Sequence, residues 1–232
     1  LTAGCLVLEG GAFRSCYSIG VMDALMMNDI NMQTVIGVSA GALTGSNYIS
    51  GQIGRSARIN LGERHNPEYI GPVAMVRTRS PIRLDFLFDE AEKKEPFNWN
   101  RFNDPARRFV IVATNCDTGK PEYFDRNTTA DIIAALKASA SMPFVSPMVD
   151  VDGKKCLDGG CSNTIPYQWA MDEGYDRIVV VRTRDASWRY EDKQEMGPEA
   201  VAQYREEKAK RMKVLRQEKA AAAKAAAAQP AS

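Results

Sequence analysis

The run Gly37-Val38-Ser39-Ala40-Gly41 constrains this chain most, because it fits one kind of backbone turn. Residues Thr34 to Val38 predict a short buried strand, and residues Ala40 to Ser50 predict the helix that follows. Glycines on both sides of a serine let the chain turn sharply, so that the hydroxyl stands clear of the sheet. The helix N-terminus beneath it favours developing negative charge. Ser39 is therefore a candidate nucleophile, with the two glycines as supporting residues.

A serine nucleophile needs a base, and the usual base is a histidine held by a carboxylate. The chain contains one histidine, His65, in the polar stretch Gly62 to Pro67. His65 follows Ser39 closely, whereas the hydrolase order of serine, acid and histidine places the histidine after a late strand. We interpret His65 as a surface residue and expect a carboxylate to serve as the base.

Asp158 is the best candidate for that carboxylate. It follows a predicted hairpin, Met148 to Leu157, in which Asp152-Gly153 indicates a type I′ turn. Gly159 and Gly160 come directly after it, which indicates a backbone that needs positive φ or a close approach to a neighbour. Asp-Gly-Gly alone is common in turns.

A third motif, Glu9-Gly10-Gly11-Ala12-Phe13-Arg14-Ser15, lies between the apolar run Cys5 to Leu8 and a predicted helix from about Cys16 to Asn28. Such a loop forms a nest of amides for an anion. A dinucleotide loop needs glycine where Ala12 and Ser15 stand, and a phosphate loop needs Gly-Lys before Ser or Thr. A nucleotide-binding domain fails both tests, so we predict an oxyanion hole from the amides of Gly10, Gly11 and Ala12. Arg14 braces this loop, attracts an anionic head group, or is an ordinary surface arginine.

In this order, the three motifs resemble the patatin-like phospholipases, and more narrowly the bacterial stand-alone members. The resemblance runs from about Leu6 to Arg184 and includes the phrases Val35 to Leu43, Ala138 to Pro143 and Asp158 to Pro166. It implies a Ser–Asp dyad without histidine, in which Ser39 is the nucleophile and Asp158 the base. It also implies ester hydrolysis without cofactor or metal, on a lipid or another acyl ester.

The chain departs from the family loop at two positions. The third glycine of the loop is Ala12 here, and the last is Ser15. Alanine supplies an N–H, but only glycine tolerates positive φ freely. The alternative function is therefore a catalytically weak or inactive relative that binds lipid.

The predicted strands and helices alternate along residues 1–185, which we assign to one acyl hydrolase domain. Further strands are expected at Phe109 to Thr114, Glu122 to Phe124 and Arg177 to Arg182, with helices at Thr129 to Ser139 and Pro166 to Glu173. This alternation predicts an α/β fold, a three-layer α/β/α sandwich around a mostly parallel sheet, with the site at the carboxyl ends of the strands. Residues 186–232 read as a charged helix followed by an alanine-rich tail, to which we assign no chemistry.

Composition narrows the possible partners. Thirty basic residues and 29 acidic ones leave a net charge of +1, which offers no attraction for nucleic acid. Five scattered cysteines predict reduced thiols and a cytoplasmic protein, with Cys161 as a packing residue, and one histidine argues against a metal site. No apolar run approaches the about 20 residues of a membrane span. No signal peptide is visible, although the chain begins at Leu1 and an earlier leader stays open.

Two stretches allow a lipid-related interpretation beside a plainer one. Met22, Met26, Met27 and Met32 could line a lipid pocket, but their helical spacing favours core packing. Between Glu68 and Arg108, arginines mix with aromatic residues, which suits a transient membrane contact or the wall of an acyl-chain site. We favour a peripheral helical cap whose aromatic residues pack on the sheet.

Overall fold

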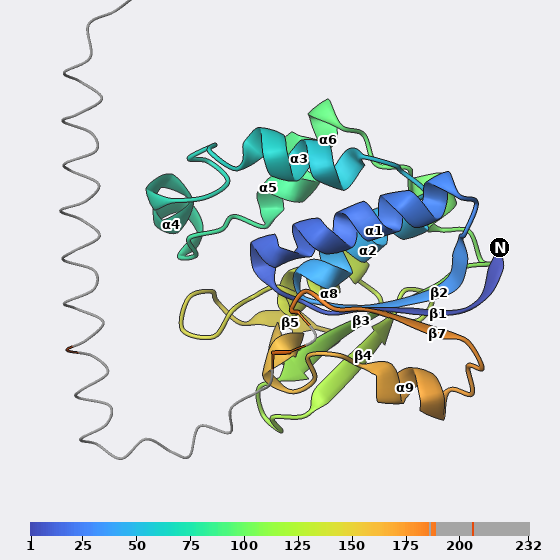
Figure 1. The fold of residues 1–232 in the computed structure, drawn as a ribbon. Helices are drawn as coiled ribbons and strands as arrows, with labels where there is room; N and C mark the ends of the chain where they lie inside the picture. The colour runs from blue at the N-terminus through green and yellow to red at the C-terminus, as the bar shows by residue number, and fades with distance from the viewer. Residues whose placement is uncertain (186, 189–205, 207–232) are drawn as a thin grey trace, which may run out of the picture. The chain divides into compact units, whose positions relative to one another are not determined.

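The fold is a mixed β-sheet with helices on both faces, seen in a computed structural model that describes residues 1–185, 187, 188 and 206 (Figure 1). Seven strands form one sheet in the order β5-β6-β3-β2-β1-β7, with β4 also paired to β3. The pairings make five of them run in one direction, while β4 and β6 run against it. The strands are β1 (Thr2–Leu8), β2 (Met32–Val38), β3 (Arg108–Asn115), β4 (Pro121–Asp125), β5 (Val149–Val151), β6 (Lys154–Asp158) and β7 (Ile178–Val181).

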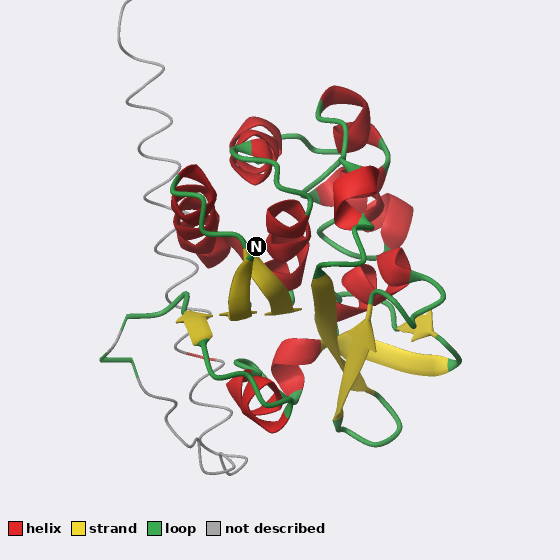
Figure 2. Cartoon of the chain, turned by 90° about the vertical axis from the view of Figure 1, so that its right-hand side faces the viewer, coloured by secondary structure: helices red, strands yellow, loops and turns green. Residues whose placement is uncertain are grey.

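The helices form a layer on each face of the sheet and a further group beyond one of these layers (Figures 1 and 2). Helices α1 (Cys16–Met27), α2 (Ala40–Ile49) and α8 (Ile132–Ser139) cover one face, and α9 (Tyr167–Asp172) lies on the other. Single 3₁₀ turns follow β1 and β6, namely η1 (Ala12–Ser15) and η2 (Gly159–Cys161). The cap consists of α3 (Arg55–Glu63), α4 (Pro72–Thr78), α5 (Asp85–Phe88), α6 (Glu90–Lys94) and α7 (Trp99–Phe102).

The central strands are apolar almost throughout because both of their faces are buried. Leu6 and Leu8 of β1 point into the core beneath α1 and α2, whereas Cys5 and Val7 point into a second core that includes Ala170 of α9. The expected three-layer α/β/α sandwich is confirmed. The antiparallel pairings lie at one edge of the sheet. There, β5 and β6 form a hairpin, and β6 pairs with the central strand β3.

Local signals in the sequence placed several turns correctly. Asp152 and Gly153 have φ of 50° and 77°, as the type I′ hairpin between β5 and β6 requires. The Asp131 side chain caps α8 by accepting a hydrogen bond of 2.9 Å from the amide of Ala134. Every strand expected in residues 1–185, including both strands of the Met148 to Leu157 hairpin, overlaps a strand of the structure, and four of the expected helices each overlap a helix.

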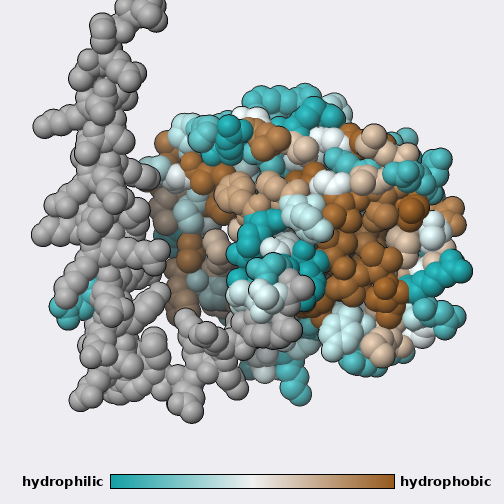
Figure 3. All heavy atoms as spheres, in the orientation of Figure 1, coloured by the Kyte–Doolittle hydropathy of each residue, from teal (hydrophilic) through white to brown (hydrophobic). Residues whose placement is uncertain are grey.

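The methionine prediction is right for three residues and wrong for the fourth. Met22, Met26 and Met32 are buried in the main core, but Met27 is 72% exposed. Met27 is the last residue of α1, where one step of about 100° round the helix turns a side chain from the core towards solvent. In Figure 3, the most continuous apolar area of that face lies over the C-terminal half of α1 and the β1–β7 edge.

We expected the aromatic residues of the cap to pack on the sheet, but only some of them do so. Phe102 does pack on the sheet, with its ring 5.7 Å from that of Phe109, but Phe86 packs inside the cap against Tyr69, at 5.1 Å. The partly buried Phe97 and Trp99 pack against the main core and also line a cavity described below. The wall-forming interpretation therefore applies to part of this stretch.

Other expectations concern the whole chain. All five cysteines are free thiols. Within the described part of the chain, no helix is both long enough and apolar enough to cross a bilayer. The charged helix and the alanine-rich tail expected in residues 186–232 lie almost entirely outside the described residues.

Candidate active site

Ser39 occupies the turn between β2 and α2. Its backbone adopts φ 55° and ψ −128°, which is unusual for a residue with a Cβ. The turn is held by the Ser39 amide, which donates to Ser139 Oγ at 2.8 Å, while Ser139 Oγ donates to the Val112 carbonyl at 2.6 Å. The flanking glycines have no room for a side chain: a Cβ on Gly37 would lie 2.7 Å from Ala42, and one on Gly41 would lie 2.6 Å from the Leu8 carbonyl oxygen.

Asp158 reaches Ser39 because β6 runs against β3. Val38 pairs with Val112 across the sheet, and Asp158 pairs with Ala113, so the end of β6 lies level with the end of β2. Ser39 Oγ donates a hydrogen bond of 2.7 Å to Asp158 Oδ2. The amide of Gly160 donates to Asp158 Oδ1 at 2.8 Å. Among the described residues, each carboxylate oxygen thus has one donor, and Ser39 is the side chain that donates to the carboxylate.

Burial raises the pKa of Asp158 above its ordinary value, because desolvation disfavours the charged carboxylate. The hydrogen bonds from Ser39 and Gly160 oppose this by stabilising the charge. Only 8% of the residue is exposed. A carboxylate of raised pKa that touches a hydroxyl is a stronger base than an exposed one, which suits proton abstraction.

Gly159 lets the chain pass directly against β3, and this close approach predicts a large effect on stability. A Cβ at this position would lie 2.2 Å from the Val112 carbonyl oxygen, inside the sheet where neither group can move away. We expect Gly159→Ala to lower the free energy of unfolding by at least about 3 kcal/mol in urea denaturation. The matched control is Gly20→Ala on the exposed face of α1, where a Cβ meets nothing within 4 Å. That change should raise stability by about 0.5–1 kcal/mol, and equal midpoints for the two variants would contradict the prediction.

The glycine loop lies beside Ser39 and is hydrogen-bonded to Thr183, a residue near the C-terminal end of the described domain. A Cβ on Gly10 would lie 2.9 Å from Ser39 Cβ, so the two segments touch. Thr183, after β7, donates its hydroxyl to the Gly10 carbonyl at 2.7 Å, and its amide donates to the buried carboxylate of Glu9. Among the described residues, none accepts a hydrogen bond from the amides of Gly10, Gly11 or Ala12. These donors are available to a ligand beside Ser39.

Two residues of the loop have positive φ, Gly11 at 155° and Ala12 at 48°. The position where a glycine was expected therefore does need left-handed backbone, and the alanine adopts it. Such a conformation costs an L-residue roughly 1–2 kcal/mol. Arg14 is exposed, and its guanidinium folds back towards Gly11, 3.1 Å from where a Cβ would stand. The Arg14 side chain thus lies against the glycine loop.

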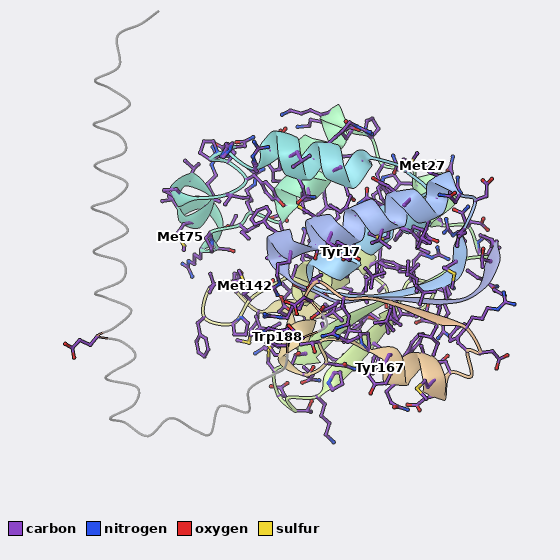
Figure 4. All side chains as sticks on the ribbon, viewed as in Figure 1. Tyr17, Met27, Met75, Met142, Tyr167 and Trp188 are labelled. Carbon is purple, nitrogen blue, oxygen red and sulfur yellow. The ribbon has the colours of Figure 1, made fainter. Side chains whose placement is uncertain are left out.

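A cavity of about 120 Å³ starts at Ser39 and Ala12 and extends between α2 and the cap. Its wall is mainly apolar, from Ile19, Leu43, Leu84, Leu87, Phe88, Phe97, Trp99, Phe102, Ile133, Leu136 and Met142. Met142 lies at the edge of the molecule that also carries Met75 (Figure 4). A space of this shape and lining can hold an alkyl chain whose polar end lies at Ser39.

The structure separates the remaining candidates from the site. His65 is exposed in the loop after α3, where its nearest polar partner is the side chain of Arg64, and it is not among the residues that line the Ser39 cavity. Cys161 was expected to be a packing residue, which is wrong: it is exposed, because η2 turns it away from the sheet. Although the residue is exposed, partial desolvation of its sulfur raises the pKa of the thiol, and so does the nearby Asp158 charge. Both effects disfavour a thiolate. Among the described residues, no three histidine, cysteine or acidic side chains are grouped to hold a metal ion.

Sequence reasoning missed two residues of the site. Ser139 holds the elbow amide, and its position inside the phrase Ala138 to Pro143 was a signal that we did not use. Thr183 anchors the glycine loop from 173 positions away, and no local pattern marks it.

Comparison with known proteins identifies a sequence family, several relatives and a solved structure with a similar fold. The sequence model of the family "Patatin-like phospholipase" matches residues 6–171. The uncharacterised protein YjjU of Escherichia coli is 30% identical over 80% of this chain, and the probable lipid hydrolase 463L of invertebrate iridescent virus 6 is 24% identical over 72%. The structure of VipD from Legionella pneumophila shares the fold, with a TM-score of 0.52 over 76% of this chain at 16% identity.

The matched relatives are longer than this chain. The aligned region spans 53% of YjjU, 62% of 463L and 49% of the VipD chain. The family match covers residues 6–171, which is well over half of the 232 residues and includes all three motifs. This chain therefore belongs to the patatin-like phospholipase family.

Proposed function

We propose that the protein is a serine-dependent lipid acyl hydrolase that uses a Ser39–Asp158 dyad. The observation that carries this proposal is the hydrogen bond of 2.7 Å from Ser39 Oγ to a buried carboxylate. A nucleophile in contact with its base, beside unused amide donors and at the end of an apolar cavity, is the set of parts that acyl transfer needs. Family membership and the printed name of 463L support the lipid class of substrate.

In the first half of the reaction, Asp158 Oδ2 takes the proton of Ser39 Oγ while that oxygen attacks the ester carbonyl carbon. The carbonyl oxygen becomes an oxyanion, and the amides of the glycine loop, from Gly10 to Ala12, donate hydrogen bonds to it. Collapse of the tetrahedral intermediate breaks the bond to the leaving alcohol, which receives the proton from Asp158. The acyl group remains esterified to Ser39.

In the second half, Asp158 takes a proton from a water molecule that attacks the acyl carbon. The second tetrahedral intermediate expels Ser39 Oγ, which regains a proton from Asp158, and the carboxylic acid leaves. Because one carboxylate serves as base and then as acid in each half, the scheme requires no histidine.

The acyl chain of the substrate would lie in the cavity along α2. Leu43, Met142 and the aromatic cap residues Phe88, Phe97 and Trp99 are among the residues that line it. In this proposal, Phe88, Phe97 and Trp99 contact the acyl chain, a role that the periodicity of the sequence did not indicate.

The alternative function, a catalytically weak or inactive relative that binds lipid, was suggested by Ala12 and Ser15, and the positive φ of Ala12 allows a test. Because Ala12 already has φ 48°, we expect Ala12→Gly to leave the amide direction unchanged and to alter kcat/KM by no more than about threefold. The measurement is hydrolysis of a short p-nitrophenyl ester by the parent and the variant. A large gain in rate would show instead that the alanine disables the loop, and would favour the binding protein.

Labelling with a fluorophosphonate tests the proposed function directly. The probe phosphonylates an activated serine, and peptide mass spectrometry locates the adduct. We expect an adduct on Ser39 in the folded parent. A folded protein that acquires no adduct on Ser39 and hydrolyses no ester contradicts the proposal.

A further inference from the structure

Four exposed apolar side chains belong to the wall of the Ser39 cavity or stand close in sequence to residues of that wall, such as Tyr69, Ile82 and Met142. The four are Phe13 (47% exposed), Met75 (44%), Val76 (84%) and Phe144 (108%), which we call the apolar rim. Phe13 also lines the cavity, and Phe144 lies two residues after Met142, which lines it as well. Large apolar side chains left this open to water usually mark a surface that binds something.

The rim comes from separate segments that the structure ties together. Helix α4 carries Met75 and Val76, and the loop after α8 carries Phe144. Ser80, just after α4, and Ser146, in the loop, join their hydroxyls at 3.0 Å. In Figure 4, Met75 and Met142 lie at the same edge of the molecule, and Met27 lies at the other end of α1. The Ser80–Ser146 hydrogen bond ties the segment that carries Met75 and Val76 to the loop that carries Phe144.

Phe144 is held outward by its backbone. Its φ is 63°, a left-handed conformation that is rare for a bulky side chain, and it lies in a turn closed by the Ser146 amide on the Met142 carbonyl at 2.9 Å. Strained backbone persists where the surrounding structure imposes it, and it gathers at functional sites. Here the strain presents a whole phenyl ring to solvent, which no folding requirement explains.

Cations accompany the apolar side chains. Arg14 follows Phe13, and Arg79 ends α4; both are exposed, and neither has an ion-pair partner among the described residues. Arg77 of α4 does pair with Glu68. Apolar side chains with unpaired arginines beside them match the boundary between acyl chains and anionic head groups.

We propose that the apolar rim docks on the surface of a lipid bilayer that contains anionic lipid. Phe144 and Val76 enter the boundary between head groups and acyl chains, and Arg14 and Arg79 contact phosphates. Docking in this way places the cavity entrance against the bilayer, so that an acyl chain passes to Ser39 without crossing water. The proposal rests on the proposed function for its substrate, but the surface can be tested without turnover.

The test is co-flotation of the full chain with vesicles of phosphatidylcholine containing phosphatidylglycerol, compared with phosphatidylcholine alone. The variant is the double change Phe144→Ser and Val76→Ser, two residues outside the cavity wall. The matched control is Met27→Ser, which removes an apolar side chain of 72% exposure at the C-terminal end of α1. Hydrolysis of a soluble p-nitrophenyl ester is measured for all three proteins.

We expect the parent and the Met27 variant to float with anionic vesicles, and the double variant to bind about tenfold more weakly. Phosphatidylcholine alone should retain less of the parent. Soluble-ester turnover should be the same in all three, and its absence from the parent would contradict the proposed function while leaving the docking result intact. Equal vesicle binding by the double variant overturns the docking proposal. The proposal is also overturned if Met27→Ser weakens vesicle binding as much as the double variant does. A third contradicting result is that the double variant changes from dimer to monomer in light scattering while its vesicle binding stays the same.

Discussion

Ser39→Ala should reduce kcat/KM for ester hydrolysis by at least about 10⁴-fold and leave the fold intact. Cys161 is not expected to replace the hydroxyl, since its side chain is exposed and the pKa of its thiol is raised. Alanine fits the elbow because the backbone of Ser39 already accommodates a Cβ. The measurements are p-nitrophenyl ester hydrolysis and the circular dichroism spectrum.

The control for this change is Ser50→Ala, at the other end of the same helix. Ser50 is buried, donates to the Asn47 carbonyl and to Gln52 Oε1, and does not itself line the cavity, so its variant should keep the parent rate. If Ser39→Ala retains more than a few per cent of the parent turnover while the fluorophosphonate adduct is lost, Ser39 is not the nucleophile. Loss of the Ser39 hydrogen bond should also raise the pKa of Asp158 further, because that bond lowers it in the parent.

Asp158→Asn should lower kcat/KM about 10³- to 10⁴-fold, because the amide cannot take the serine proton. In the parent, kcat/KM should rise with pH as Asp158 ionises, at a pH above that of an ordinary aspartate, because burial raises its pKa. Asp150→Asn is the matched control. Asp150 is an exposed aspartate in the same hairpin, and its change should leave both the rate and the pH profile unaltered.

Asp158→Asn should also make the protein more stable at neutral pH. A carboxyl whose pKa is higher folded than unfolded contributes stability below the unfolded pKa, and that contribution is lost as the pH rises through the folded pKa. Asparagine stays uncharged, and its side-chain oxygen can still accept from the Gly160 amide. We therefore expect a higher urea midpoint for Asp158→Asn at pH 7, and a difference that shrinks towards pH 4. Equal midpoints at pH 7 would show that burial of the charge imposes no penalty.

The sequence motifs indicated the roles of the site glycines and of Ala12, but they did not indicate the exposure of Cys161 and Met27. Glycines 37, 41 and 159 were expected from motif alone, and the structure supplies the reason, since each faces backbone at a distance that excludes a Cβ. The positive φ of Ala12 was stated as a condition for the loop, and the backbone shows that the condition applies. Cys161 and Met27 were assigned from pattern and proved exposed, because both stand where an element ends and its side-chain direction changes.

The cap was the least predictable part of the fold. Helices α4 to α7 contain four to seven residues each, too few for a helical period to be recognised. The packing of Phe86 on Tyr69 and of Phe97 on Trp99 holds them instead, and such contacts leave no regular spacing in the sequence. The aromatic part of the cavity wall and two of the four rim residues, Met75 and Val76, come from this region, so their positions could not be derived beforehand.

The sequence by itself determined the elements whose causes are local: the elbow at Ser39, the glycine loop, the hairpin turn at Asp152 and the apolar strands buried on both faces. Backbone sterics and hydrogen bonds within a few residues suffice for these. Only the tertiary structure decided that Asp158 touches Ser39 across 119 positions, that Thr183 anchors the loop, and that the cap encloses a cavity. Those contacts depend on the register of β6 against β3 and on how the cap helices pack on α2, and no local pattern in the chain encodes either.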